Sequence, residues 1–159
     1  MNLIDRIIQR AQRTPYFHLA GYMNRWWLVP YNTPSEPNSG PVSWRRPIAK
    51  ILQHFDIAVR VHEILRSDYE RHPHDHPWWY VTVILRGNYI ETRYNDEGRL
   101  IDVNHWGPGS VLFRKASSWH RLTLPERGST WTLFIMGPKS RGWGFNVNGR
   151  KVPWREYLL

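Results

Sequence analysis

Three histidines, His72, His74 and His76, occupy alternate positions at the start of the stretch from residue 72 to residue 87. In an extended segment successive side chains point to opposite faces, so these three rings would project the same way. Imidazole nitrogens suit zinc, copper, iron and nickel, and the chain holds no cysteine that would offer a softer ligand. The spacing therefore predicts a segment that chelates a metal ion.

The composition limits what the rest of the chain can be. Its 159 residues fit one domain, and its ten tryptophans provide large anchors for a core or for the walls of a pocket. The absence of cysteine excludes disulfides, zinc fingers and thiol nucleophiles, and it leaves the redox compartment open. Histidine and carboxylate side chains must therefore carry any metal chemistry.

The net charge of +9 suggests an anionic partner, because basic surfaces attract phosphates and nucleic acids. The basic residues are mostly arginine, however, and they are scattered along the chain instead of gathered into one run. We therefore interpret them as solvated surface and disfavour nucleic-acid binding.

Residues 3–13 are predicted to form an amphipathic basic helix, which Pro15 ends. A helix of this length favours packing on the domain, or on a second subunit in a homodimer, over contact with an anionic membrane surface. No run in the chain approaches the roughly 18 apolar residues that a membrane span needs, so we expect a cytoplasmic protein. The apolar face of the helix holds Leu3, Ile4, Ile7, Ile8 and Ala11.

Residues 16–30 are rich in aromatic side chains, and residues 31–43 contain enough proline and glycine to predict a loop. That loop is too short to separate two domains, so residues 1–56 are predicted to be a helix and an extension packed on the main domain. The tail, residues 138–159, holds Trp143, Phe145 and Trp154. Because exposed large apolar patches are uncommon, we expect the tail to pack across one end of the domain instead of forming a separate recognition arm.

Residues 57–137 show apolar and polar residues alternating with a period of two, which predicts short strands. Turn signals rich in glycine, asparagine and proline separate them. Many short strands at nearly even spacing favour an all-β sandwich or barrel. The predicted strands cover 57–62, 80–86, 89–95, 100–104, 110–114, 120–124 and 130–136.

The segment that holds His74 and His76 resembles the first motif of the RmlC-like cupins, in which His-x-His is followed by Glu and then by Gly. Here Tyr80 stands in the Glu position and Gly87 in the Gly position. The second cupin motif runs from Pro-Gly through a short apolar strand and a loop to His, and residues 108–120 resemble it. The resemblance covers residues 57–137 and implies a cupin jelly roll, or double-stranded β-helix, behind an N-terminal helical extension. It also implies a homodimer.

A closed barrel would bring His74 and His76 together with His120 from a distant strand, giving three nitrogen ligands and leaving positions open. We favour a metal site over a hydrogen-bonded core cluster, because three polar rings are costly to bury together without a partner. His72 is a second choice, since only His74 and His76 put Gly87 at the distance that the cupin motif has. His62 is an alternative occupant of the same cavity, and a structural role is favoured for it and for His18, His54 and His105.

Because Tyr80 stands where many cupins have a Glu ligand, the predicted ligand set consists of three neutral histidines. This set resembles that of the thiol dioxygenases. In the cysteine dioxygenase family a His-x-His strand without Glu leads to an apolar stretch, Gly and a Glu-Thr pair, as residues 84–87 with Glu91 and Thr92 do here. His120 begins a stretch that resembles the family's later His-Arg-Val. The family's His and Tyr on a later strand have no counterpart in residues 132–136, so its substrate recognition and proton transfer are not carried over.

Two further residues are candidate catalytic residues. Tyr80, facing inward, would hydrogen-bond a ligand on the metal or simply line the cavity. Arg86, near the barrel mouth, would hold a carboxylate or phosphate in a bidentate fork or stay solvated beside a turn. Asp75 has the opposite parity to its neighbouring histidines, which indicates support behind the ligands or a surface position.

We therefore predict a metal-binding cupin that uses Fe(II), or else zinc, nickel or manganese, to oxidise a small anionic substrate with oxygen. The predicted enzyme is a mononuclear non-haem dioxygenase. The alternative is a non-catalytic ligand-binding or sensory cupin whose metal is structural or vestigial, because one fold hosts unrelated functions.

Overall fold

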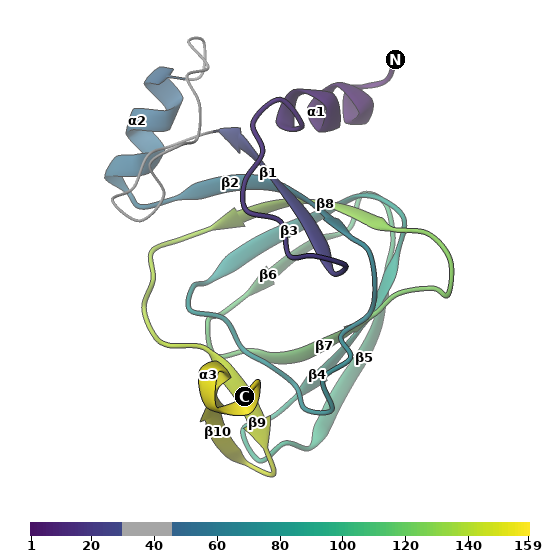
Figure 1. Cartoon of the computed structure of the whole chain (residues 1–159), viewed down its shortest axis with the longest axis vertical. Coiled ribbons are helices and arrows are strands. Elements are labelled where there is room, and N and C mark those ends of the chain that lie inside the picture. Colours follow the sequence, from purple (N-terminus) through teal and green to yellow (C-terminus); the bar gives the residue numbers. More distant parts are fainter. Residues whose placement is uncertain (30–45) are drawn as a thin grey trace.

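The computed structural model describes residues 1–29 and 46–159, and the loop predicted for residues 31–43 lies outside these described residues. Strands outnumber helices in the described part of the chain (Figure 1), which confirms the all-β prediction. Each predicted strand is present, with ends that differ from the prediction by at most two residues. The elements are α1 (Leu3–Ala11), β1 (Met23–Val29), α2 (Arg46–His54), β2 (Ala58–Ile64), β3 (Tyr80–Arg86), β4 (Tyr89–Tyr94), β5 (Leu100–Trp106), β6 (Val111–Arg114), β7 (Trp119–Thr123), β8 (Thr130–Met136), β9 (Gly144–Val147), β10 (Arg150–Pro153) and α3 (Trp154–Tyr157).

Two antiparallel sheets form the barrel. The larger sheet has the order β1-β2-β8-β3-β6 and the smaller one β5-β4-β7, and they lie on opposite sides of a common interior (Figure 1). Strands β2 and β3 pair with the two edges of β8, so Phe134 lies between Arg60 and Thr82 in register. Strands far apart in sequence therefore present side chains to one space.

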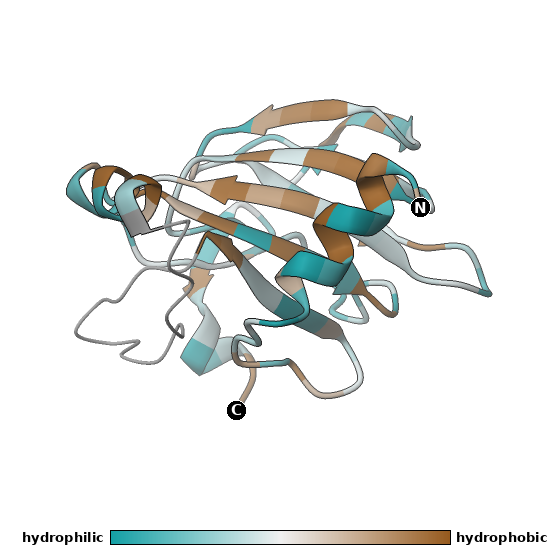
Figure 2. Cartoon of the chain, turned by 90° about the horizontal axis from the view of Figure 1, so that it is seen from above, coloured by the Kyte–Doolittle hydropathy of each residue, from teal (hydrophilic) through white to brown (hydrophobic). Residues whose placement is uncertain are grey.

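The alternation of side chains along each strand separates the inside of the barrel from the outside. In β8 the residues at every second position from Thr130 to Met136 are buried and those between are half-buried. Apolar stretches accordingly run along the strands of the larger sheet (Figure 2). The turn from β3 to β4 needs Gly87, whose φ of +78° suits glycine and where a Cβ would lie 2.4 Å from the Ser129 backbone oxygen.

The N-terminal helix packs on the outer face of the larger sheet. Asn2 and Asp5 form a capping box at its start, and Ile8 and Ala11 are buried in a cluster with Trp26. Strand β1 extends the same sheet, so the predicted boundary between residues 56 and 57 runs between two paired strands. No helix in the described ranges is long and apolar enough to cross a membrane.

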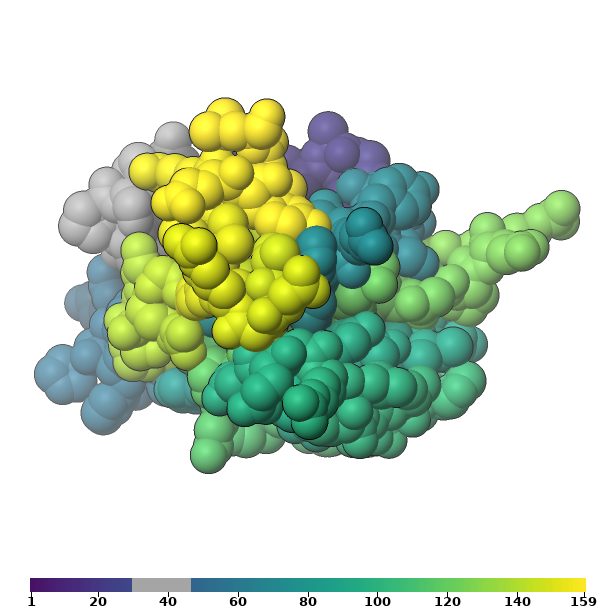
Figure 3. Space-filling view, turned by 90° about the horizontal axis from the view of Figure 1, so that it is seen from below, coloured from purple at the N-terminus to yellow at the C-terminus, as the bar shows by residue number. Residues whose placement is uncertain are grey.

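The C-terminal segment forms a β9–β10 hairpin followed by the single turn α3, and these lie together at one end of the barrel (Figure 3). Phe145 is buried, and the Trp143 and Trp154 rings stack 5.5 Å apart. Asp75 connects this segment to the barrel, because its carboxylate accepts hydrogen bonds from the Gly144 backbone N–H at 2.8 Å and from Lys151. The aromatic residues of the tail therefore pack together at the barrel end.

Candidate metal centre

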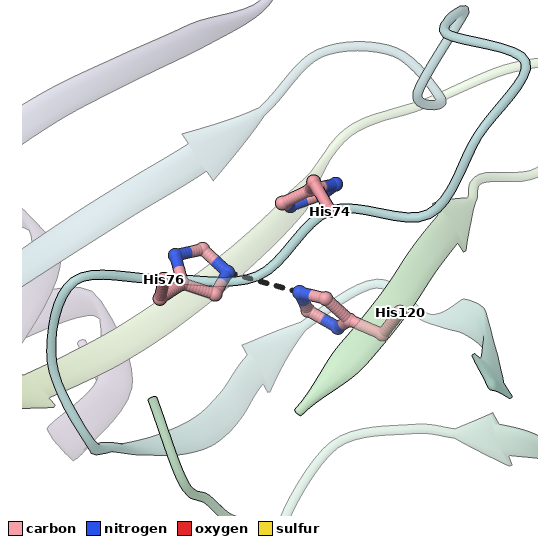
Figure 4. Close-up of side chains that lie close together, drawn as sticks. All are labelled: His74, His76 and His120. Atoms are coloured by element: carbon pink, nitrogen blue, oxygen red, sulfur yellow. Dashed lines mark hydrogen bonds between the residues drawn. The ribbon is translucent and has the colours of Figure 1, made fainter. Parts of the chain in front are cut away.

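Three imidazoles converge on one point inside the barrel (Figure 4). His74 and His76 lie in the segment between β2 and β3, and His120 lies on β7. The backbones of His74 and His120 exchange two hydrogen bonds of 3.0 Å, which joins that segment to the opposite sheet. One ring nitrogen from each histidine lies within 4.8 Å of the other two, and the Nε2 atoms of His76 and His120 are 2.9 Å apart.

Glu91 on β4 orients His120. It is 1% exposed, and its carboxylate accepts hydrogen bonds from His120 Nδ1 at 3.0 Å, from Trp106 Nε1 at 3.1 Å and from the guanidinium of Arg114. Burial alone would raise the pKa of Glu91, but the hydrogen bonds from His120 and Arg114 outweigh it and hold this pKa at about 2. The ionised carboxylate therefore places the His120 proton on Nδ1 and leaves the Nε2 lone pair facing the other histidines.

A second carboxylate lies behind His74. Asp68 Oδ2 is 3.7 Å from His74 Nδ1, and Asp68 itself accepts hydrogen bonds from the Tyr22 hydroxyl at 2.6 Å and the Leu122 backbone N–H at 2.7 Å. Burial lowers the pKa of His74 to about 4, although Asp68 acts in the opposite direction. His74 is therefore neutral at physiological pH.

His76 is enclosed by aromatic rings. Its imidazole stacks on Trp78 at 5.9 Å and meets Tyr80 edge-on at 4.8 Å. Burial, together with the neighbouring His120 and His74 rings, holds the pKa of His76 well below its usual range. This histidine also offers an uncharged nitrogen.

The donor set fits a transition-metal ion. A metal requires unprotonated imidazole nitrogens, and burial and Glu91 provide them here. Two nitrogens bound about 2.1 Å from one ion and at a right angle to each other lie about 3.0 Å apart, close to the 2.9 Å between His76 and His120. His76 and His120 therefore need little rearrangement to share an ion.

Tyr80 lies beside this group. Its hydroxyl is 3.3 Å from His120 Nε2, and its ring stacks on Phe134 at 4.9 Å. Burial and the nearby Glu91 carboxylate raise the pKa of Tyr80 well above its usual range, so the phenol keeps its proton. It is placed to donate a hydrogen bond to a group held at the histidines.

The three histidines and Tyr80 line a cavity of about 480 Å³. This volume lies within the range of about 300 to 1,000 Å³ that is common for small-molecule sites. Most of the lining is aromatic or aliphatic, and the C-terminal residues Trp143, Phe145, Trp154 and Leu158 form part of it. The cavity therefore extends the candidate metal centre into an apolar binding space.

No protein-family model matches the chain, and no curated protein matches it in sequence. Similar folds are found among solved structures. The polyketide cyclase RemF from Streptomyces resistomycificus is 17% identical with a TM-score of 0.52, over 84% of this chain and 78% of RemF. A protein with a double-stranded β-helix domain from Klebsiella pneumoniae is 14% identical with a TM-score of 0.51, over 92% of this chain and 96% of that one.

A variant of oxalate decarboxylase from Bacillus subtilis is 15% identical with a TM-score of 0.50 over 80% of this chain, which spans 28% of that protein. These matches agree with the arrangement of the antiparallel sheets. The chain has the cupin fold. At these identities the likeness concerns the fold alone, and the chemistry of this protein must be argued from its own residues.

The cupin barrel brings together four of the five predicted site residues, His74, His76, His120 and Tyr80, but it does not bring Arg86 to them. Arg86 is half exposed and forms a 2.5 Å ion pair with Asp5 of α1, outside the cavity. A shift in the pairing of β3 with β8 between residues 84 and 86 breaks the alternation, so Arg86 follows the outer face. Arg86 therefore does not lie at the cavity as the anion-binding residue that the sequence suggested.

The alternative histidines have other positions. His72 Nδ1 lies 2.9 Å from the Tyr157 hydroxyl, away from the three-histidine group. His62 enters the cavity as one of its lining residues, but it is not part of the group. Asp75 is fully buried and supports the C-terminal hairpin instead of lying at the surface.

Sequence reasoning missed the roles of Glu91 and Asp68. Glu91 was visible as half of a Glu-Thr pair that resembles the thiol dioxygenases. Asp68 lies outside the regular strands, and no local pattern marks it. Both carboxylates act through contacts with residues that are distant in sequence.

Proposed function

We propose that this cupin binds one Fe(II) ion through His74, His76 and His120 and oxidises a small anionic substrate with oxygen, as a mononuclear dioxygenase. The observation that carries the proposal is the convergence of three imidazoles on the wall of a cavity that can hold a small molecule. Zinc, nickel and manganese are the other ions that this nitrogen set would accept.

The ion would supply Lewis-acid and redox chemistry when bound, and three protein ligands leave it with open positions. The protein's own part is orientation. Glu91 fixes the ring and tautomer of His120, and the Tyr80 hydroxyl donates a hydrogen bond to a substrate group beside the histidines. The aromatic lining excludes water from that group, which strengthens each polar contact.

A non-catalytic ligand-binding cupin is the second candidate. One observation favours it specifically: Tyr80 occupies the position of the acidic cupin ligand and is held protonated by burial, so the chain adds no charged donor at that position. In this case the metal would hold the two sheets together and the cavity would bind a ligand without converting it. The cytoplasmic location and the homodimer stay predictions under both candidates.

Metal analysis followed by oxygen measurements tests the proposal. The purified protein is expected to hold about one ion per chain. The iron-loaded protein is then mixed with a panel of thiols and small carboxylic acids, and oxygen consumption with at least one of them supports a dioxygenase. Bound iron with no turnover on any compound supports the ligand-binding candidate. Failure of the protein to bind any of the four metals overturns the dioxygenase proposal and leaves the ligand-binding candidate with a vestigial metal site.

A further inference from the structure

Three polar side chains of the larger sheet line the cavity without belonging to the candidate metal centre. They are His62 on β2, Thr132 on β8 and Thr82 on β3, and each is at most 6% exposed. His62 and Thr132 are partners in the pairing of β2 with β8, so their side chains lie side by side on the inner face of the sheet. Burial lowers the pKa of His62 well below its usual range, and Arg60 and Arg25 lower it further. The imidazole is therefore neutral, and the three side chains offer hydrogen bonds without charge.

His62 has an unsatisfied polar atom. Its Nε2 is buried and has no hydrogen-bond partner among the described residues. The two arginines beside it have partners within the protein. The Arg60 guanidinium carbon lies 3.9 Å from the centre of the Tyr16 ring. Arg25 Nε donates a hydrogen bond of 2.7 Å to the Phe17 backbone oxygen. The imidazole is therefore the group through which this wall would hold a ligand.

A hydroxyl group is the ligand group that suits this imidazole. A buried polar atom without a partner costs free energy, and a ligand that hydrogen-bonds the ring of His62 recovers it. A hydroxyl donates to a ring nitrogen that lacks a proton and accepts from one that carries a proton, so it fits either tautomer. An ionised ligand group would lose its hydration to meet a neutral ring and neutral threonines, which is less favourable.

Aromatic rings connect His62 to the candidate metal centre. The Phe134 ring stacks on His62 at 4.7 Å and on Tyr80 at 4.9 Å. Trp78 meets Phe134 edge-on at 6.5 Å and stacks on His76 at 5.9 Å. A ligand ring gains edge-to-face or offset contacts with such a wall in addition to the apolar area that it buries, and a saturated body does not. The cavity therefore favours an aromatic ligand.

We propose that the cavity binds a phenol, whose aromatic ring lies along Phe134 and Trp78 and whose hydroxyl group hydrogen-bonds the imidazole of His62. The other end of the molecule then points toward His76. Which end reacts, and the anionic group that it carries there, rest on the proposed function; binding of the phenol does not. The proposal narrows the substrate from any small anion to one that is built on a hydroxylated aromatic ring.

Calorimetric titration of the metal-free protein tests this binding separately from metal chemistry. The probes are 2-naphthol, naphthalene, which lacks the hydroxyl, and decahydro-2-naphthol, which keeps the hydroxyl on a saturated body. We expect 2-naphthol to bind about fivefold more tightly than naphthalene, because one neutral hydrogen bond contributes about this much. It should bind at least about threefold more tightly than decahydro-2-naphthol, because aromatic contacts add to apolar burial.

Two outcomes of these titrations would overturn the proposal. The first is that 2-naphthol does not bind. The second is that naphthalene or decahydro-2-naphthol binds as tightly as 2-naphthol does.

Replacing His62 with Phe tests where the hydroxyl lies. This change keeps a ring beside Phe134 and removes both ring nitrogens, so the folded variant should bind 2-naphthol and naphthalene equally tightly. The matched control is His105→Phe, the same replacement at an exposed histidine of β5 outside the cavity, which should leave the preference for 2-naphthol unchanged. A preference that survives in folded His62→Phe protein would refute the contact with His62.

Nitrogen-15 NMR of the histidine rings gives a second readout in the unmodified protein, so the test stands even where His62→Phe does not fold. Addition of 2-naphthol should shift a ring-nitrogen resonance of His62 further than naphthalene does, because a hydrogen bond changes the shielding of the nitrogen directly. Equal shifts with the two compounds would contradict the proposal.

Two results separate this proposal from the proposed function. A preference for 2-naphthol that persists in metal-free His76→Ala protein supports the phenol site, whatever that variant does to iron. Metal binding with no preference for 2-naphthol over naphthalene supports the metal centre and refutes the phenol site.

Discussion

Replacing Glu91 with Gln tests whether the carboxylate behind His120 organises the candidate metal centre. Glu91 is 1% exposed and accepts hydrogen bonds from His120, Arg114 and Trp106. Gln keeps the shape of the side chain but removes its charge and one acceptor oxygen. Arg114 then loses its buried counter-ion, and no anion fixes the tautomer of His120.

The structure gives the size of the effect in two ways. Breaking one side of a buried ion pair costs about 3 to 5 kcal/mol. The pKa of Glu91, held at about 2 against an ordinary value of 4.5, corresponds to about 3 kcal/mol in favour of the ionised form. We therefore expect Glu91→Gln to lower the free energy of unfolding by about 3 kcal/mol and metal affinity by about 10- to 100-fold.

Urea unfolding followed by circular dichroism measures the first effect, and competition with a chelator measures the second. Glu63→Gln is the matched control. Glu63 is half-buried and accepts hydrogen bonds from Asn24 and Ser129, but it does not line the cavity. Its loss should cost about 1 kcal/mol and leave metal affinity unchanged. If Glu91→Gln behaves like the control in both assays, the orienting role of Glu91 is refuted.

Two further changes act on stability. Gly87→Ala should lower the free energy of unfolding by about 2 kcal/mol, because the φ of +78° disfavours a side chain and the new Cβ would meet the Ser129 backbone oxygen. Thermal melting measures this loss. The control is Gly107→Ala, which should melt like the wild type because Gly107 has open space around it. The metal-free protein should lose stability as the pH falls from about 6.5 to 4, since the unfolded state takes up the proton that folded His74, with a pKa of about 4, excludes. A second loss of stability should follow from about pH 4.5 to pH 2. Over this range Glu91 takes up a proton in the unfolded state but stays ionised in the folded state, where its pKa is about 2. Urea midpoints that stay level from pH 8 to pH 3 would contradict both assignments.

Strong alternation made the strands predictable. In β3 and β8 the side chains of one face lie inside the barrel and those of the other face lie outside. The alternation of apolar and polar residues therefore marks where each strand begins and ends. Strand β1 does not show this alternation, because its consecutive residues Trp26 and Trp27 are both buried. Trp26 packs against the helix cluster on the outer face, while Trp27 packs with Tyr80 inside the barrel. A strand covered on both faces carries no alternating signal.

The site was predictable where its spacing is local and not where it depends on long-range pairing. The His74 and His76 alternation and the motif around His120 brought three ligands to one expected point. The position of the Arg86 side chain depends on an irregularity in the pairing of β3 with β8 and on an ion pair with Asp5, 81 residues away in sequence. Counting alternate positions along one strand assumes unbroken pairing, so it does not predict which face this arginine takes.

The central claim is that His74, His76 and His120 hold one metal ion between the two sheets. Titration of the metal-free protein with Co(II), followed by visible absorption, measures it directly, because the intensity and position of the bands report nitrogen ligands. The account predicts saturation at one ion per chain in the wild type and no specific binding in His76→Ala or His120→Ala, with circular dichroism showing that the barrel remains folded. Equal binding of one ion by the wild type and by both folded variants would contradict it.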